Sequence, residues 1–244
     1  MRLDDPELVR NEYASEEGLR ARRSIYDGAA LTEPVEVALA EVAAIRPCRV
    51  LEVGCGWGEF AARIRDDLGA EIVATDLSPR MVELARGRGL DAGVADVRSL
   101  PFADGAFDCI VANWMLYHVD QLDRALGELA RVLRRGGRLV ATTTAYDHLA
   151  ELWALVGRDR SSEPARFFAE TGELELRKHF THVRHRVLRH ELVLADAVAA
   201  RDYVAASVAH KHLAQQLPTF EGSLAVTSVG QTRPGSDLTV MIRL

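Results

Sequence analysis

Apolar residues in the middle of the chain form short continuous runs, and the segments between them have helical spacing. The runs cover residues 49–53, 71–75, 90–95, 107–113 and 138–143. Helices are predicted over 59–68, 79–86 and 121–133, the last closed by Gly136 and Gly137. Continuous apolar runs are typical of strands buried on both faces. Their alternation with helices therefore predicts an α/β fold with a doubly wound, mostly parallel sheet.

The two flanks of this region are less regular. Residues 4–45 predict two or three helices, one of them over 33–45. Beyond residue 146, helices are expected around 147–157, 164–179 and 196–216, beside a strand near 181–194. The runs 224–229 and 238–242 enclose Pro234 and Gly235, which predicts a terminal hairpin. Seven strands are expected in total, the last of them antiparallel.

Length and charge narrow the possible functions. The chain has 244 residues and a formal net charge of -6, which suits one α/β domain and lacks the basic balance of a nucleic-acid binder. No apolar run is long enough for a membrane span, and residues 1–6 do not resemble a secretory signal. The spacing of the three cysteines matches no metal site, so we expect a protein that binds no metal, and reduced thiols suit a cytoplasmic location. A monomer or a homodimer is expected.

The most informative segment is the turn after the first strand. Gly54, Gly56 and Gly58 follow Val53 and precede a helix. Glycine there allows the backbone to approach a ligand closely, and the helix offers unpaired N–H groups. Asp76 ends the second strand 22 residues after Gly54, where a carboxylate can accept both hydroxyls of a ribose. Asp96 ends the third strand and can accept a hydrogen bond from an adenine amino group.

The glycine spacing separates two classes of nucleoside enzyme. A dinucleotide enzyme needs G-x-G-x-x-G, but here the third glycine comes one residue early and Glu59 stands in its place. Glu52 precedes the turn, where it would repel a pyrophosphate and attract an ammonium group. The segment 50–58 therefore resembles motif I of the class I S-adenosylmethionine-dependent methyltransferases. Segments 72–81, 95–102, 107–111 and 133–139 resemble later parts of that family in the same order.

This resemblance implies a Rossmann-like fold, S-adenosylmethionine as cofactor and S-adenosylhomocysteine as product. Glu52 and Gly54 would face the methionine portion, Asp76 the ribose, and Leu77 and Met81 the adenine ring. The resemblance extends the cofactor site to the following residues: Tyr26, Cys55, Gly56, Gly58, Asp96, Val97 and Asn113. The resemblance covers roughly residues 45–145, and the flanks carry no signature of the family. We expect a single domain of 1–244 with a helical cap (1–45), a cofactor-binding core (46–145), substrate-side helices and a strand (146–217) and terminal strands (218–244).

Candidates for the chemistry follow the fourth strand. The methyl group of a sulfonium is already activated, so the protein chiefly positions the acceptor and excludes water. His118 is the candidate general base, because its ordinary pKa of about 6.5 lies near neutrality. Tyr117 is a candidate for orienting the acceptor, and Trp114 for its pocket wall. A structural or cofactor-lining role for His118 is the alternative.

Three other functions compete with methyl transfer to a small molecule. An RNA methyltransferase is disfavoured by the acidic balance and by Asn113-Trp114-Met115-Leu116, which is not the Asn/Asp-Pro-Pro-aromatic motif of base amino methylation. A non-enzymatic S-adenosylmethionine-binding module would have no room for an acceptor. A nicotinamide oxidoreductase is disfavoured by Glu52 and by the glycine spacing. The acceptor partner is expected to be a small molecule, with neither nucleic acid nor membrane involved.

Overall fold

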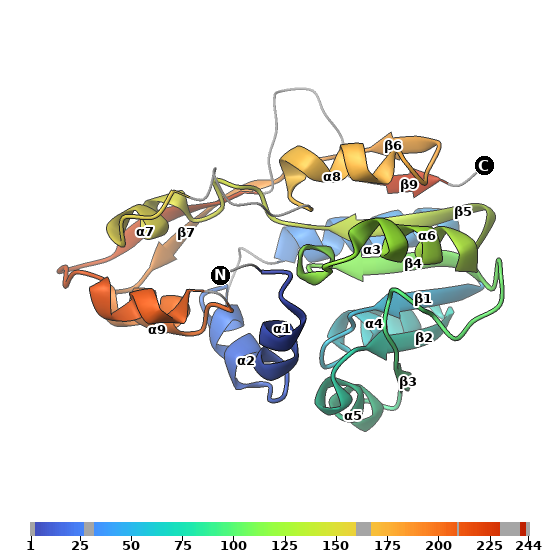
Figure 1. Ribbon diagram of the computed structural model, residues 1–244, viewed down its shortest axis with the longest axis horizontal. Coiled ribbons are helices and arrows are strands. Elements are labelled where there is room, and N and C mark those ends of the chain that lie inside the picture. The colour runs from blue at the N-terminus through green and yellow to red at the C-terminus, as the bar shows by residue number, and fades with distance from the viewer. Residues whose placement is uncertain (1–2, 27–31, 160–166, 209, 230–239, 243–244) are drawn as a thin grey trace.

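A computed structural model describes residues 3–26, 32–159, 167–208, 210–229 and 240–242. Its centre is a sheet of five adjacent parallel strands in the order β3-β2-β1-β4-β5 (Figure 1). These strands are β1 (Arg49–Val53), β2 (Glu71–Asp76), β3 (Asp91–Val94), β4 (Phe107–Asn113) and β5 (Leu133–Thr142). The predicted class, a doubly wound and mostly parallel sheet, is confirmed.

Two three-residue strands extend the β5 edge of this sheet. β9 (Val240–Ile242) pairs antiparallel with β5, and β6 (His182–Arg184) pairs antiparallel with β9. The central parallel sheet thus has five strands rather than the expected seven. The other two strands, β6 and β9, are short additions at its edge, and β9, the last in the chain, is antiparallel to β5. Their shortness explains why periodicity places them poorly.

One face of the sheet is covered by helices from the first half of the chain. They are α3 (Thr32–Ile45), α4 (Glu59–Arg63), its π-helical continuation η1 (Ile64–Leu68), and α5 (Pro79–Gly87). Val50, Ile72 and Cys109 point to this face and pack with Leu39 and Val82 in one buried cluster. Ser78 begins α5 as predicted, its hydroxyl accepting the N–H of Met81.

The opposite face is covered by α6 (Leu122–Val132) and α8 (Ala169–Leu176). Leu51 and Ile110, each next in sequence to a residue of the first face, pack here with Leu126 and Leu129. Side chains alternate between the faces of a strand, so a continuous apolar run fills both layers. The parallel sheet is therefore buried on both sides, as the sequence predicted.

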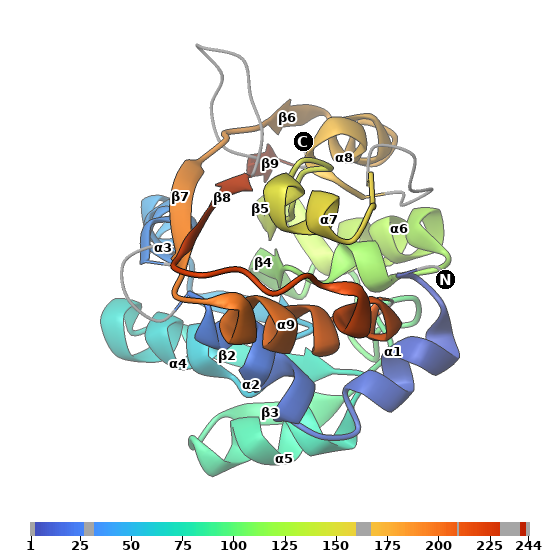
Figure 2. The same cartoon turned by 90° about the vertical axis from the view of Figure 1, so that its left-hand side faces the viewer.

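A third group of elements lies beyond the carboxyl ends of the strands. β7 (Arg189–Leu194) and β8 (Leu224–Val229) form a separate antiparallel pair. They pack with α7 (Ala150–Leu155), α9 (Ala197–Ala205) and the 3-10 helix η4 (Lys211–Gln216) in a third apolar cluster. The N-terminal helices α1 (Pro6–Glu12) and α2 (Glu17–Ser24) lie on the same side, with α2 close to α9 (Figure 2).

Three local predictions are wrong. Helix α6 ends at Val132, and Gly136 and Gly137 belong to β5 rather than closing the helix. The run 181–194 contains two strands, β6 and β7, which belong to different sheets. The runs 224–229 and 240–242 do not pair as a hairpin, because β8 pairs with β7 and β9 with β5. The predicted turn residues, 234 and 235, lie outside the described residues.

The fold predicts a large stability difference between two leucines. Leu129 is fully buried between α6 and the sheet, whereas Leu174 on α8 is 68% exposed. Leu129→Ala should lower the free energy of unfolding by about 2–5 kcal/mol through lost burial and a residual cavity. Leu174→Ala should change it by less than about 0.5 kcal/mol. Urea denaturation of both variants measures this, and equal losses would contradict the assignment of the α6 face.

Candidate functional site

A cavity of about 510 Å³ lies at the carboxyl ends of the parallel strands, where the strand order reverses between β1 and β4. Its walls come from all three parts of the chain: the N-terminal helices, the strand ends, and the segments before α7 and around α9. The structure brings together most of the predicted site residues on this lining: Tyr26, Glu52, Gly54, Cys55, Gly56, Asp76, Leu77, Asp96, Val97, Asn113, Tyr117 and His118. Gly58 and Met81 are not part of the lining.

The glycine turn is shaped by close packing. Gly54 has φ +64°, and a Cβ there would lie 2.7 Å from the Cβ of Met115. Gly58 has φ +78°, and a Cβ there would meet the side chain of Leu90 at 2.6 Å. Gly54 is thus required beside the cavity, whereas Gly58 is required for close packing of the turn on Ala85 of α5 and on Leu90. The cofactor role predicted for Gly58 stays a prediction.

Glu52 is a buried acid with an incomplete set of partners. It lies on β1, is 2% exposed, and its Oε2 atom accepts no hydrogen bond. Burial raises the pKa of Glu52 to about 8, opposed in part by the backbone N–H of Ala61. A buried carboxyl oxygen without a donor carries a free-energy cost, which a cationic group in the cavity would offset.

Asp76 joins the glycine turn to the second strand. Its Oδ2 accepts the N–H of Gly56 at 2.9 Å, and its Oδ1 accepts the N–H of Ser78 at 2.9 Å. Burial nevertheless raises the pKa of Asp76 above its ordinary value. The Leu77 N–H also donates to this carboxylate, and of the roughly four acceptor positions on its two oxygens at least one is left for a ligand hydroxyl. The predicted ribose contact is therefore geometrically open.

Asp96 has a partner that the sequence did not reveal. Arg98 donates to both of its carboxylate oxygens, from Nε at 2.9 and 3.0 Å and from Nη2 at 2.6 Å, and it also reaches Asp120 at 2.6 Å. The hydrogen bonds of Arg98 hold the pKa of Asp96 below its usual range. Asp96 is therefore a fixed, ionised acceptor at the cavity wall. The pair is local in sequence, but nothing in the spacing separates it from a surface ion pair.

The predicted adenine contacts divide into two groups. Leu77 is 39% exposed and Val97 9% exposed, and both line the cavity. Met81 is fully buried and does not reach the cavity lining. Cys55 lines the turn with a thiol that donates to the Gly56 carbonyl at 3.4 Å. The positions of Leu77 and Val97 fit an apolar slot for a flat ring, whereas the buried side chain of Met81 does not line the cavity.

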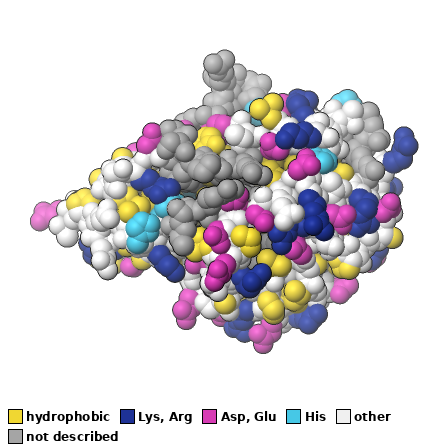
Figure 3. Space-filling model, viewed as in Figure 1, with side chains coloured by type: hydrophobic (Ala, Val, Ile, Leu, Met, Phe, Trp, Pro, Cys, Tyr) yellow, Lys and Arg dark blue, Asp and Glu magenta, His cyan; other side chains and the backbone are white. Residues whose placement is uncertain are grey.

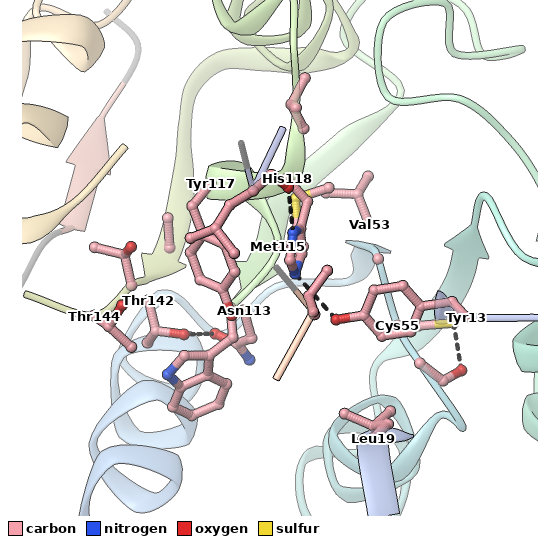
Figure 4. A pocket seen from close by; sticks show the side chains of 18 of the residues that line it. Tyr13, Leu19, Val53, Cys55, Asn113, Met115, Tyr117, His118, Thr142 and Thr144 are labelled. Atoms are coloured by element: carbon pink, nitrogen blue, oxygen red, sulfur yellow. Dashed lines mark hydrogen bonds between the residues drawn. The ribbon is translucent and has the colours of Figure 1, made fainter. Parts of the chain in front are cut away.

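The end of β4 is strained and polar. Trp114 has φ +51°, a conformation that is uncommon for a residue other than glycine, and its N–H donates to the Thr142 carbonyl at 3.0 Å. The hydroxyl of Thr142 donates to Oδ1 of Asn113 at 2.8 Å (Figure 4). That bond leaves Nδ2 of Asn113 buried without an acceptor. Strain and an unpaired donor at the same strand end are typical of a ligand site.

His118 lies in the 3-10 helix η2 (Leu116–His118), with both ring nitrogens engaged. Nδ1 lies 2.9 Å from the Leu3 carbonyl, and Nε2 lies 3.0 Å from the Tyr13 hydroxyl (Figure 4). Because a carbonyl only accepts, Nδ1 carries the proton and Nε2 accepts from Tyr13. Burial lowers the pKa of His118 to about 4. These contacts favour the structural alternative for His118 over the role of general base.

Three residues important to the cavity carry no motif. Tyr13 and Arg22 come from the N-terminal helical cap, and His148 comes from the segment before α7. The Tyr26 hydroxyl, expected at the cofactor, lies 2.9 Å from Nε2 of His148. Tyr117 packs at 4.5 Å between ring centroids against His118. Only the tertiary fold brings Tyr13 to His118 and Tyr26 to His148, since the members of these pairs are 105 and 122 residues apart in sequence.

The described residues fit S-adenosylmethionine better than a dinucleotide. An ammonium group would supply the donor that Glu52 Oε2 lacks, and Asp76 has acceptor capacity for a ribose. A pyrophosphate would bring negative charge towards both acids. Within the described part of the chain, no group of three or more His, Cys, Asp or Glu residues can hold a metal ion. No described helix is long and apolar enough to cross a membrane.

Comparisons with known proteins agree with this chemistry. Residues 51–141 match the family described as "Methyltransferase domain". The malonyl-[acyl-carrier protein] O-methyltransferase of Enterobacter lignolyticus is 41% identical over 116 residues, 47% of this chain and 46% of that protein. The demethylmenaquinone methyltransferase of Thermus thermophilus is 41% identical over 101 residues, 38% of this chain and 46% of that protein. The matches thus span about half the length of these curated relatives.

The fold also has a solved counterpart. The crystal structure of the [4+2]-cyclase SpnF matches with a TM-score of 0.57 and 21% identity, over 92% of this chain and 95% of that one. At this identity the likeness shows the fold alone.

The buried acid predicts an unusual dependence of stability on pH. A carboxyl whose pKa is raised to about 8 in the folded protein, from about 4.3 when unfolded, favours the protonated form on folding. This carboxyl costs no stability below about pH 4, and the cost grows as pH rises to about 8, where it reaches on the order of 5 kcal/mol. Glu52→Gln should therefore stabilise the ligand-free protein at pH 8 and have little effect at pH 5.

Urea denaturation at pH 5 and pH 8 tests this for the wild type, for Glu52→Gln and for a control, Glu221→Gln. Glu221 is exposed and should give the wild-type dependence. An unchanged difference between the two pH values in Glu52→Gln would contradict an unpaired buried carboxyl.

The histidine contacts predict its protonation state. Because burial lowers its pKa to about 4, His118 should stay neutral, with the proton on Nδ1, from pH 8 to about pH 5. Nitrogen-detected imidazole NMR, assigned with a His118→Gln variant, follows this directly. Protonation with a midpoint near pH 6.5 would contradict the buried arrangement and restore His118 as a candidate base.

Proposed function

We propose that this chain, whose residues 51–141 form a methyltransferase domain of the class I S-adenosylmethionine-dependent family, transfers a methyl group from S-adenosylmethionine to a small-molecule acceptor. The observation that carries the proposal is the pair of buried acids at the reversal of the strand order. Glu52 offers an unpaired oxygen to an ammonium group, and Asp76 offers acceptors to a ribose, on adjacent strands. A nucleoside joined to an amino acid satisfies both.

The protein's own residues would hold the cofactor in three portions. Glu52 and the turn at Gly54–Gly56 receive the amino-acid end, and Asp76 receives the ribose. Leu77 and Val97 border the adenine, with Asp96 held by Arg98 at its edge. When bound, the cofactor supplies an activated methyl group on a sulfonium. The Asn113 backbone, at the end of β4 and on the cavity lining, would lie beside the sulfonium, and the part of the cavity beyond it would hold the acceptor.

The acceptor half is enclosed by aromatic and polar side chains. Tyr13, Tyr117 and His118 line one side, and Tyr26 and His148 join the cap to the segment before α7. Tyr117 is proposed to orient the methyl acceptor. His118 is proposed to position Tyr13, because its neutral ring accepts a hydrogen bond from the Tyr13 hydroxyl. Such walls exclude water and hold the nucleophile in line, the two contributions that methyl transfer needs from a protein.

A small acceptor is favoured over RNA. The relatives named above are methyltransferases whose names refer to a malonyl carrier protein and to demethylmenaquinone. On the face shown in Figure 3, basic and acidic side chains are interspersed rather than gathered by sign. Nucleic-acid binding usually requires a continuous basic surface.

A cytoplasmic location is also proposed, supported by three cysteines without disulfides.

Calorimetric titration tests the cofactor assignment. The wild type should bind S-adenosylmethionine and S-adenosylhomocysteine with micromolar dissociation constants and should not bind NAD⁺. Asp76→Ala should weaken S-adenosylhomocysteine about a hundredfold, because it removes acceptors for the ribose and the anchor of Gly56. The control Asp91→Ala, at the exposed start of β3, should bind like the wild type. Binding of NAD⁺ alone, or wild-type affinity in Asp76→Ala, would overturn the proposal.

A further inference from the structure

Helix α2 of the N-terminal cap packs against the glycine turn that follows β1. A Cβ atom placed on Gly56 would lie 3.6 Å from Cδ2 of Leu19. Further along the helix, Arg23 forms an ion pair with Glu59 at 2.6 Å, and its guanidinium carbon lies 5.4 Å from the centroid of the Trp57 ring. Because Trp57 belongs to the turn and Glu59 begins α4, α2 lies over the turn itself.

Arg22 lies one helical turn after Leu19, on the same side of α2. Its guanidinium carbon is 5.5 Å from the centroid of the Tyr13 ring. The backbone carbonyl of Tyr13 accepts the hydroxyl of Ser78, two residues after Asp76. Burial raises the pKa of the Tyr13 phenol, the charge of Arg22 opposes this shift, and the charge of Asp76 adds to it. Arg22 therefore lies beside the ends of β1 and β2, where the cofactor is proposed to bind.

The guanidinium of Arg22 is only partly hydrogen-bonded. Its Nη1 donates to the Glu12 carboxylate and to the Ala206 carbonyl. Its Nη2 is buried and has no hydrogen-bond partner, although Arg22 contributes to the cavity lining. The side chain of Arg22 is 16% exposed, so water compensates this loss poorly. A buried N–H donor beside a cavity is stabilised by an oxygen acceptor, best of all by an anion.

The other arginines of the cavity lining are less suited to a ligand anion at this place. Arg23, Arg63 and Arg98 form ion pairs with acids of the chain and are more exposed than Arg22. Arg186 follows β6, which β4, β5 and β9 separate from β1. Within the described residues, Arg22 is the only lining arginine with a buried nitrogen that lacks a hydrogen-bond partner.

The unpaired atoms near the turn match the two charges of an amino-acid zwitterion. Oε2 of Glu52, on β1, is a buried acceptor without a donor, and Nη2 of Arg22 is a buried donor without an acceptor. An α-amino acid carries its ammonium and carboxylate groups on one carbon atom, so it needs partners of opposite charge. Glu52 offers one of them from the sheet, and Arg22 offers the other from the cap.

We propose that Nη2 of Arg22 binds the carboxylate of the cofactor's amino-acid portion. This inference rests on the proposed function. The contacts of Nη1 with Glu12, at the end of α1, and with Ala206, at the end of α9, already fix the guanidinium. Little side-chain entropy is therefore lost when the carboxylate binds. The same contacts join the bound cofactor to both the cap and the C-terminal elements.

Calorimetry at pH 7.5 tests this with two ligands. One is S-adenosylhomocysteine, and the other is its decarboxylated analogue 5′-deoxy-5′-(3-aminopropylthio)adenosine, which keeps the adenosine, the sulfur and the amino group. The wild type should bind S-adenosylhomocysteine about tenfold more tightly than the analogue, the difference expected for a charge-assisted hydrogen bond. Arg22→Gln should abolish that preference by weakening S-adenosylhomocysteine about tenfold, with the affinity for the analogue changed by less than about twofold.

Two further variants guard the interpretation. Arg10→Gln, at an exposed position on α1, removes the same charge from the cap and should keep the preference for S-adenosylhomocysteine. The double variant Glu12→Gln/Arg22→Gln avoids leaving the Glu12 carboxylate buried alone, and it replaces Arg22→Gln if the single variant does not fold. The preference should be lost in this double variant as well.

The outcomes separate the inference from the function on which it rests. Equal binding of the two ligands by the wild type, or a preference that survives in Arg22→Gln, overturns the carboxylate contact alone, because S-adenosylhomocysteine still binds. Equal weakening of both ligands in Arg22→Gln assigns the guanidinium a purely structural role in the cap and also overturns it. If the wild type binds neither ligand, the proposed function fails and the inference falls with it.

Discussion

The reversal of strand order between β1 and β4 is the constraint on which the cavity depends. Helices that follow β1 and β2 pack on one face of the sheet, and the helix that follows β4 packs on the other. The connections leaving β1 and β4 must therefore part at the carboxyl edge, where they open a gap between them. The hydrogen bond from Gly56 N–H to Asp76 draws the β1 turn towards β2 and keeps that gap open. The cap and the C-terminal third then close over it.

Several buried polar atoms at this gap lack partners, and this pattern links stability to function. Glu52 Oε2, Arg22 Nη2 and Asn113 Nδ2 are each buried without a hydrogen bond. Such atoms reduce the stability of the ligand-free fold, and a bound ligand of matching polarity recovers that free energy. Substrate and cofactor would thus stabilise the arrangement that binds them. The strained backbone of Trp114 at the same edge fits this pattern.

The core of the fold and the cofactor half of the site could be predicted because their signals are local. β1 and β4 begin and end where the apolar runs predict, and Ser78 caps α5 as its sequence indicates. The periphery could not be predicted, since β6 and β9 have three residues each and pair across more than fifty positions. The residues around the acceptor could not be predicted for the same reason. Tyr13 and His118 meet only in the tertiary structure, and their contact changes the interpretation of His118 from a base to a neutral hydrogen-bond acceptor.

The central claim is that Glu52 receives the amino group, and Asp76 the ribose, of one bound nucleoside. A crystal structure of the complex with S-adenosylhomocysteine tests this most directly. We expect the ligand amino group within hydrogen-bond distance of Glu52 Oε2 and both ribose hydroxyls on the Asp76 carboxylate. A complex in which the amino group lies away from Glu52, or in which the ribose contacts neither oxygen of Asp76, would contradict it.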